Sequence, residues 1–173
     1  MLLKDGLIDP LNAQITNEFH AHTQYVAIAT YFDHEGLPEL AGHFYRQSEE
    51  ERDHAMKFVR YILDAGARPT ITYDGAPKVR NDFGSASEAV QFALDQELKV
   101  TDQINDLVRL AIEKSDYTTH TFLQWFVNEQ LEEVSSMSNL LQIIKHAGSS
   151  LLLVEDFIRR GAGKSHGGGG SQD

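Results

Sequence analysis

The sequence predicts an all-α protein that folds as a four-helix bundle, with a short fifth helix at its C-terminal end. Four long segments repeat apolar residues at steps of three and four, the pattern of helices packed nearly parallel or antiparallel. One long connection without any such period separates the second segment from the third. Each of the four segments also carries a glutamate on its apolar stripe near mid-helix, so these four side chains are expected to share one layer of the core.

The first two helices are expected over residues 8–34 and 38–65. Gly36 supplies a helix stop and Pro38 a favourable first helical position, so the connection between them should be short. Gly66 then ends the second helix.

Periodicity fails over residues 68–87, where proline and glycine accumulate. A stretch of this length without a helix is unusual in a compact domain unless it has a structural task. A connection that runs the length of a bundle has such a task, because it leaves the helices on either side of it parallel. We therefore expect a long crossover between the second and third helices.

The third helix should begin at the Ser-x-x-Glu capping signal of residues 85–88 and continue to about Lys114. A tight break at residues 115–117 precedes the fourth helix, which should end near His146. A short fifth helix is expected over residues 151–160.

Residues 1–160 are expected to form a single domain. The remaining segment, 161–173, is rich in glycine and serine and is expected to be disordered. Its Gly-Gly-Gly-Gly-Ser run resembles an artificial flexible linker.

Composition excludes several classes of function. The absence of cysteine rules out disulfides, thiolate zinc sites and rubredoxin-type iron centres. A formal net charge of −11 argues against a nucleic-acid partner and favours cations, although solubility alone also explains an acidic surface. No basic-then-apolar leader and no apolar run of membrane-spanning length occur, so a cytoplasmic protein without a membrane partner is expected.

The glutamates on the stripes are the candidate site. Burial of an ionised carboxylate without a partner costs several kcal/mol, and the stripes contain no lysine or arginine that could pair with it. A pair of metal ions between the helices would supply the missing positive charge. A Glu-x-x-His pair on the second helix adds one imidazole, and a set of oxygen ligands with a single imidazole suits iron or manganese. The set consists of Glu18, Glu51, His54, Glu97 and Glu133.

The sequence resembles the bacterial non-haem ferritins from Asn17 to about Arg160. The resemblance rests on one motif in each long helix. These motifs are Asn-Glu-Phe…Gln-Tyr in the first, Glu-Glu-Glu-Arg-Asp-His-Ala in the second, Asp-Gln-Glu in the third and Gln-Trp-Phe-Val-Asn-Glu-Gln-Leu-Glu-Glu in the fourth. It implies a ferritin-like bundle with a long crossover between its second and third helices.

The matching positions of that family form a diiron ferroxidase centre. By resemblance, Glu18, Glu51 and His54 hold the first iron. Glu51 bridges to the second iron, which Glu97 and Glu133 complete.

Further positions are assigned by the same resemblance. Gln130 would sit beside the two irons, and Tyr25 would lie near the centre as an electron donor, although a core tyrosine with a satisfied hydroxyl is an equally good explanation of its spacing. Glu50, Glu129 and Glu132 match the residues of a third, weaker iron position. They flank the stripe, so a solvated charged face remains the alternative.

Two departures separate this chain from the bacterioferritins, and a third separates it from the animal ferritins. Bacterioferritins have a second Glu-x-x-His in the fourth helix, whereas this chain has Gln-Leu-Glu-Glu at 130–133. They also carry a haem-ligating methionine where this chain has Arg52, so haem is not expected. Animal ferritins line a three-fold pore with acids at the start of the fourth helix, where this chain has His120 and Leu123.

The resemblance implies an iron-storage ferritin that oxidises Fe²⁺ to Fe³⁺ with O₂ or H₂O₂ and stores ferric mineral inside a hollow homo-oligomer of 24 subunits. The short fifth helix agrees with this, because such helices pack around the four-fold axes of the family's shells. Two alternatives stay open. One is a dimeric diiron oxidase or peroxidase without storage, and the other is a bundle whose acids only bind divalent ions.

Overall fold

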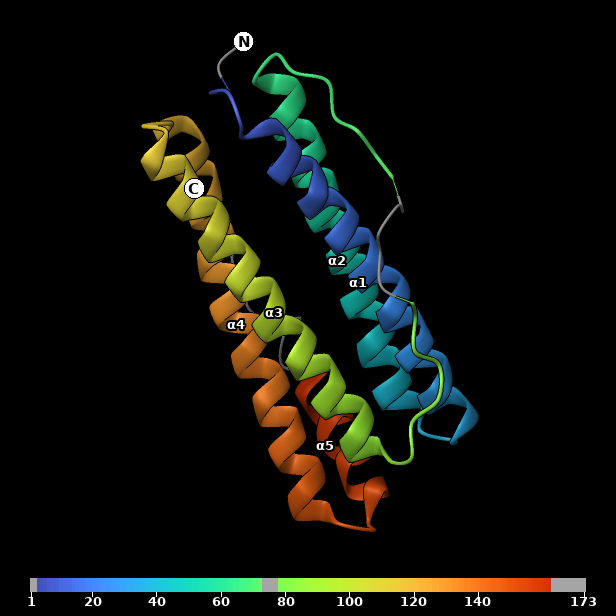
Figure 1. Ribbon diagram of the computed structural model, residues 1–173. Helices are drawn as coiled ribbons and strands as arrows, with labels where there is room; N and C mark the ends of the chain where they lie inside the picture. The colour runs from blue at the N-terminus through green and yellow to red at the C-terminus, as the bar shows by residue number, and fades with distance from the viewer. Residues whose placement is uncertain (1–2, 73–77, 163–173) are drawn as a thin grey trace, which may run out of the picture.

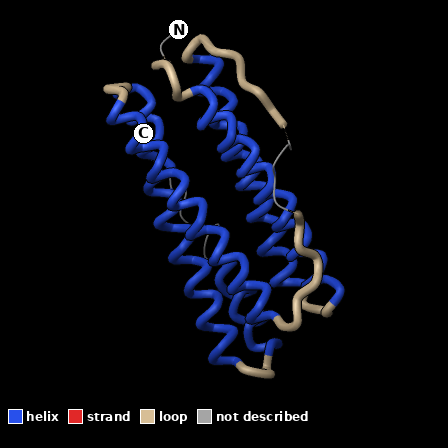
Figure 2. The backbone as a smooth tube through the Cα atoms, in the orientation of Figure 1, coloured by secondary structure: helices blue, strands red, loops and turns tan. Residues whose placement is uncertain are grey.

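The computed structural model of the protein describes residues 3–72 and 78–162, and these residues form an all-α bundle (Figures 1 and 2). No strand occurs in this part of the chain. The predicted fold class is therefore confirmed. The helices are α1 (Ile8–His34), α2 (Pro38–Asp64), α3 (Ala86–Glu113), α4 (Tyr117–Ala147) and α5 (Leu151–Ala162).

The four long helices pack as two close pairs, α1 with α2 and α3 with α4. The pairs lie against each other along their length, and α5 packs across one end of the bundle against α2 and α4 (Figure 1). Helix boundaries agree with the predicted ones within two residues. The largest difference is at α5, which continues to Ala162 instead of ending at Arg160.

The described parts of the crossover between α2 and α3, residues 65–72 and 78–85, run along the outside of α1 (Figures 1 and 2). The Thr16 hydroxyl donates to the Thr72 carbonyl at 2.8 Å, and two turns further the Gln24 side chain both donates to and accepts from the backbone of Arg80, at 2.7 and 2.8 Å. Because the crossover and α1 run in the same direction, α3 starts at the same end of the bundle as α2. The two helices are therefore parallel, as predicted.

The expected stop and start signals occur at the helix ends. Gly36 adopts φ +74° between α1 and α2, a backbone conformation that a residue with a side chain rarely adopts, and Pro38 is the first residue of α2. At the start of α3 the Ser85 hydroxyl accepts from the Glu88 N–H at 3.1 Å, while the Glu88 carboxylate accepts from the Gly84 N–H at 2.7 Å. This exchange satisfies one backbone donor of the first turn and one just before the N-cap residue.

The apolar core is divided into two clusters at opposite ends of the bundle. In α1 one cluster ends at Ile15 and the other begins at Tyr25, and in α2 the corresponding limits are Phe58 and Phe44. Buried polar side chains occur in the interval between the clusters on all four long helices. The position of the site thus follows from the interruption of four apolar stripes at one height.

None of the helices in the described ranges is long and apolar enough to span a membrane. Residues 163–173, which include most of the predicted glycine-rich tail, lie outside the described residues.

Candidate metal centre

The layer between the two apolar clusters contains the predicted glutamates and the histidine. All five side chains are buried, with at most 5 % of each residue exposed. They come from four helices: one glutamate each from α1, α3 and α4, and the Glu-x-x-His pair from α2. The structure therefore places the five predicted residues in one layer.

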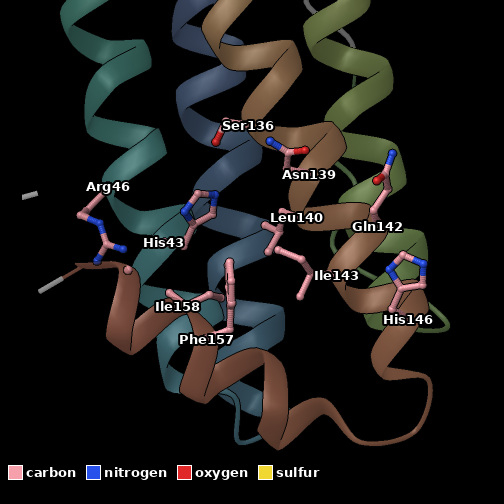
Figure 3. A pocket seen from close by; sticks show the side chains of 11 residues that line it. His43, Arg46, Ser136, Asn139, Leu140, Gln142, Ile143, His146, Phe157 and Ile158 are labelled. Carbon is pink, nitrogen blue, oxygen red and sulfur yellow. The ribbon is translucent and has the colours of Figure 1, made fainter. Parts of the chain in front are cut away.

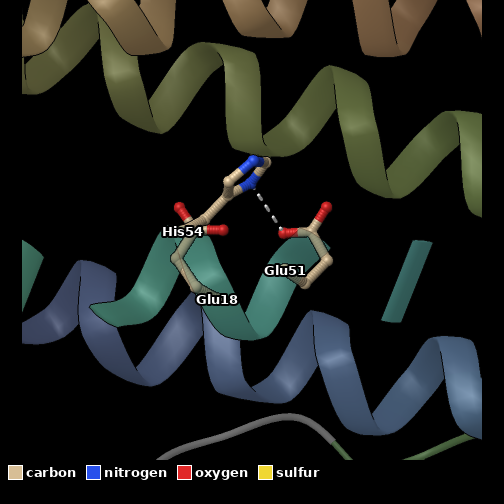
Figure 4. A group of neighbouring side chains, drawn as sticks. All are labelled: Glu18, Glu51 and His54. Atoms are coloured by element: carbon tan, nitrogen blue, oxygen red, sulfur yellow. Dashed lines mark ion pairs between the residues drawn. The ribbon is translucent and has the colours of Figure 1, made fainter. Parts of the chain in front are cut away.

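The first group of potential ligand atoms belongs to Glu18, Glu51 and His54. One donor atom of each lies within 4.8 Å of the other two. Glu18 lies on α1, Glu51 and His54 lie on α2, and their side chains lie side by side beneath α3 (Figure 4). His54 Nδ1 is 3.4 Å from Glu51 Oε2. The three-residue spacing in α2 puts Glu51 and His54 on the same helix face, which is why this pair forms locally.

A second group combines His54 with Glu129 and Glu133 of α4. Their donor atoms also lie within 4.8 Å of one another, and His54 Nε2 is 3.7 Å from Glu129 Oε1. The two ring nitrogens of His54 therefore face different groups. This second group differs from the one expected from the sequence, which joined Glu51 and Glu133 to Glu97.

The carboxylate of Glu97 is oriented by hydrogen bonds to Tyr25 and Gln130 instead of joining this group. Its Oε1 accepts a short hydrogen bond from the Tyr25 hydroxyl, and its Oε2 accepts from Gln130 Nε2 at 3.1 Å. Gln130 also donates to the Glu97 backbone carbonyl at 3.2 Å. Tyr25 and Gln130 thus lie beside the layer as predicted, and both contact it through Glu97. The hydrogen bond also satisfies the Tyr25 hydroxyl, as the alternative explanation of this residue requires.

The electrostatics of the layer are those of acids held close together in a dry core. Burial raises the pKa of Glu18 well above its ordinary value, and the nearby Glu51 carboxylate raises it further. Burial and the Glu97 charge do the same for the pKa of Glu51. Burial, with Glu97 again adding to it, raises the pKa of Glu133 to about 8.

Burial also raises the pKa of Glu97, although the hydrogen bonds from Tyr25 and Gln130 oppose the rise. No lysine or arginine of the described residues forms a salt bridge with these four glutamates. A divalent cation is therefore the partner that would let them ionise together.

Gln14 orients Glu18 and was not identified from the sequence. It is buried one turn before Glu18 in α1, and its Nε2 donates to Glu18 Oε1 at 2.7 Å. Asn17 Nδ2 in turn donates to Gln14 Oε1 at 3.2 Å. The other carboxylate oxygen of Glu18, Oε2, is buried without a hydrogen-bond partner, so it is free to bind a cation. The four-residue spacing of Gln14 and Glu18 is the signal in the sequence that could have revealed this contact.

The residues predicted for a third iron position line one cavity of about 360 Å³. Glu50, Glu129 and Glu132 meet there beside Glu133, and Gln47 Nε2 holds Glu50 Oε2 at 2.6 Å. Burial raises the pKa of Glu50, and the charge of Glu129 raises it further. Glu129 contacts His54 as well, so the cavity adjoins the buried layer directly.

The donor set consists of carboxylate oxygens and one imidazole, which suits hard divalent cations such as Fe²⁺ and Mn²⁺. A four-helix bundle with inward-facing glutamates and a Glu-x-x-His pair defines a class of carboxylate-rich, metal-binding bundles. Comparison with known protein families agrees: residues 8–147 match the ferritin-like domain. The chain belongs to the ferritin family.

Similar proteins include ferritins of several prokaryotes. Ferritin BfrB of Mycobacterium tuberculosis is 47 % identical over 150 residues, which cover 87 % of this chain and 82 % of that protein. The bacterial non-heme ferritin of Staphylococcus aureus is 36 % identical over 147 residues, or 85 % and 87 % of the two chains. An open-pore ferritin from the archaeon Archaeoglobus fulgidus superposes with a TM-score of 0.86 at 28 % identity, covering 91 % of this chain and 96 % of that one.

Proposed function

We propose that this protein is an iron-storage ferritin that oxidises Fe²⁺ at the buried layer and stores the ferric product as a mineral. The observation that carries the proposal is the layer of four buried glutamates from four helices, with no lysine or arginine of the described residues paired to them. Such a layer is unfavourable in the absence of cations and favourable in their presence. The membership of the chain in the ferritin family supports iron as the metal.

Fe²⁺ is the substrate of the reaction. Two Fe²⁺ ions held together give up one electron each, and O₂ takes both electrons with two protons to leave as H₂O₂. Where H₂O₂ is the oxidant, it takes two electrons and two protons to leave as two water molecules. Holding both ions in one site allows the two electrons to be delivered together, which a single Fe²⁺ ion cannot do.

Each ligand has a defined part in this proposal. Glu18 and His54 hold the first Fe²⁺, and Glu51 bridges the two ions. Glu97 and Glu133 hold the second, with Gln130 fixing the orientation of Glu97 through its hydrogen bond. Hard carboxylate oxygens suit Fe³⁺ better than Fe²⁺, so the same ligands favour oxidation. Tyr25, bonded to Glu97, is placed to supply an electron to the centre.

A third iron position is proposed in the acidic cavity, with Glu50, Glu129 and Glu132 as ligands. Glu129 lines this cavity and also contacts His54. Iron oxidised at the buried layer would therefore move to the third position past Glu129.

Storage requires a hollow assembly, and we propose a homo-oligomer of 24 subunits that carries no haem. The proposal rests on the ferritins that this chain resembles and on the presence of α5 at the end of the bundle. The rival function, a dimeric oxidase without storage, is distinguished by the particle's mass under native conditions. A particle no larger than a dimer would remove storage from the proposal.

The site assignment predicts that Glu51→Ala and His54→Ala each slow the first phase of Fe²⁺ oxidation at least tenfold. Each change removes a ligand, and Glu51 is also the bridge between the ions. Stopped-flow mixing of the apoprotein with Fe²⁺ in air measures this phase. Asp53→Ala is the matched control, because Asp53 lies between the two ligands in α2 but is exposed and paired with Arg52. An unchanged fast phase in either ligand variant would show that oxidation occurs elsewhere.

The third position gives a separate prediction. Glu132→Ala should leave the first oxidation phase intact, because Glu132 is exposed and belongs to neither ligand group of the layer. The variant should alter repeated turnover or the ratio of Fe²⁺ oxidised to O₂ consumed. In this proposal iron leaves the centre through the cavity that Glu132 lines. Oxygen-electrode measurements over successive Fe²⁺ additions test this. Wild-type turnover and stoichiometry in the variant would remove Glu132 from the iron path.

A further inference from the structure

A second and larger cavity lies between α2, α4 and α5. Its volume is about 880 Å³, within the range of small-molecule sites. Figure 3 shows Leu140 and Ile143 of α4 facing Phe157 and Ile158 of α5, and these four apolar side chains form its base. Arg46 and His146 lie on opposite sides of that base (Figure 3).

The remaining side chains of the lining are polar, apart from Gly161, which has none, and their charge is unusual for this chain. The chain has 26 acidic residues against 15 lysines and arginines. The lining of this cavity nevertheless contains Arg46 and two histidines and no aspartate or glutamate. Arg46 forms no salt bridge with any carboxylate of the described residues, and its charge acts on Glu50 of the acidic cavity while its side chain also lines this one.

The contrast with the acidic cavity next to it is direct. Both cavities are lined by His43, Arg46 and Ser136. The rest of the lining of the smaller cavity includes four glutamates, whereas the rest of the lining of the larger cavity includes the apolar base. The smaller cavity therefore suits a cation, whereas an apolar molecule with a negative group suits the larger one.

His43 provides an independent sign of a polar partner. Its Nε2 atom is buried and has no hydrogen-bond partner. A buried polar atom in this condition is rare in a folded protein and unfavourable. His43 lines the cavity beside Arg46, so a hydrogen-bonding group of a ligand bound there would be a partner for the imidazole.

We propose that this cavity binds a small anionic amphiphile, a carboxylate with an apolar chain or ring. The apolar part packs on Leu140, Ile143 and Phe157, and the carboxylate pairs with the Arg46 guanidinium. Arginine suits this role because its planar fork of donors matches a carboxylate. The site lies outside the iron-binding layer and is a binding function beyond the proposed iron chemistry.

Isothermal titration of the intact apoprotein with sodium octanoate tests the proposal. We expect one binding event per subunit and at least tenfold weaker binding in Arg46→Met, which keeps the length of the side chain and removes its charge. Arg60→Met is the matched control, because Arg60 is exposed on the same helix and lines neither cavity, and it should bind octanoate as the parent does. Ile143→Trp should block binding by filling the base.

Octylammonium chloride separates anion recognition from simple apolar burial, because it carries the same chain with the opposite charge. It should bind at least tenfold more weakly than octanoate. The proposal is overturned if octanoate does not bind, if Arg46→Met and Arg60→Met bind it equally, or if octylammonium binds as tightly. Unchanged affinity in Ile143→Trp, with native helix content, would place the ligand elsewhere and also overturn it.

Discussion

Glu18 shows how a single residue of the centre depends on neighbours that never touch the metal. Gln14 holds one oxygen of its carboxylate and leaves the other facing the site. Groups that orient a ligand in this way commonly change metal affinity by about 10–100-fold when they are removed. Gln14 is therefore a positioning residue of the centre.

Replacing Gln14 by leucine should weaken binding of Fe²⁺ at the centre roughly tenfold, because Glu18 loses the hydrogen bond that fixes its rotamer. Trp125 provides the measurement. It is the only tryptophan of the chain, and its ring centroid lies 5.4 Å from that of His54, so its fluorescence should report anaerobic Fe²⁺ titrations.

Gln91→Leu is the control for this variant. Gln91 donates to Asp95 at 3.0 Å with the same four-residue spacing, but the pair lies at the surface of α3 away from the layer. Equal affinities for Fe²⁺ in Gln14→Leu and Gln91→Leu would show that the Gln14 contact has no part in metal binding.

Among the helices, α5 is attached to the bundle by a contact that its amphipathic pattern does not indicate. Glu155 is buried, and its carboxylate accepts from the backbone N–H groups of Glu39 and Leu40 at 2.8 and 2.9 Å. These donors belong to the first turn of α2, which has no side-chain cap from its own N-cap residue. An acid from α5 thus caps α2 and complements the positive end of its dipole.

Glu155→Ala should lower the thermal midpoint of the protein by several degrees, since loss of a helix cap costs about 0.5–2 kcal/mol and two backbone donors, one of them buried, lose their acceptor. Differential scanning calorimetry of the apoprotein measures this. Asp156→Ala is the control, because Asp156 pairs only with Arg160 in an exposed contact of α5 and should change the midpoint little. If the two variants have the same melting temperature, the cap does not hold α5 in place.

At the scale of the whole molecule, the bundle is two apolar cores joined by a layer of acids, and the layer makes stability depend on pH. The pKa values of Glu18, Glu51, Glu97 and Glu133 are raised above the unfolded value near 4.5 by burial. Between that value and the folded pKa, the folded state binds more protons than the unfolded state. The contribution of these groups to stability is therefore complete below pH 4.5 and is lost as pH rises through the folded pKa values.

The apoprotein should accordingly melt several degrees lower at pH 8 than at pH 5, with Glu133 titrating near pH 8 at the upper end of this window. Anaerobic loading with Fe²⁺ should restore much of the melting temperature lost at pH 8, because the cation stabilises the ionised carboxylates. Thermal melts across this pH range, with and without Fe²⁺, make the comparison.

Glu133→Gln should flatten the pH dependence, and Glu132→Gln, an exposed neighbour on α4, should leave it as it is. An apoprotein that gains stability from pH 5 to pH 8 would contradict the raised pKa values.

The sequence by itself determined the helices, the long crossover and the layer of glutamates, because each depends on local rules. Three- and four-residue periods define helix faces, glycine and proline mark their ends, and an acid on an apolar stripe is visible without a structure. For the same reason it identified Glu51 and His54 as a pair within α2.

Only the tertiary structure decided which atoms face one another across the helices. Glu129 joins His54 and Glu133, while Glu97 is directed to Tyr25 and Gln130, and neither contact follows from spacing within one helix. The same holds for the Glu155 cap on α2, which joins residues more than a hundred positions apart. Helix period fixes the face on which a side chain lies, whereas rotamers and the packing of neighbouring helices decide its partner.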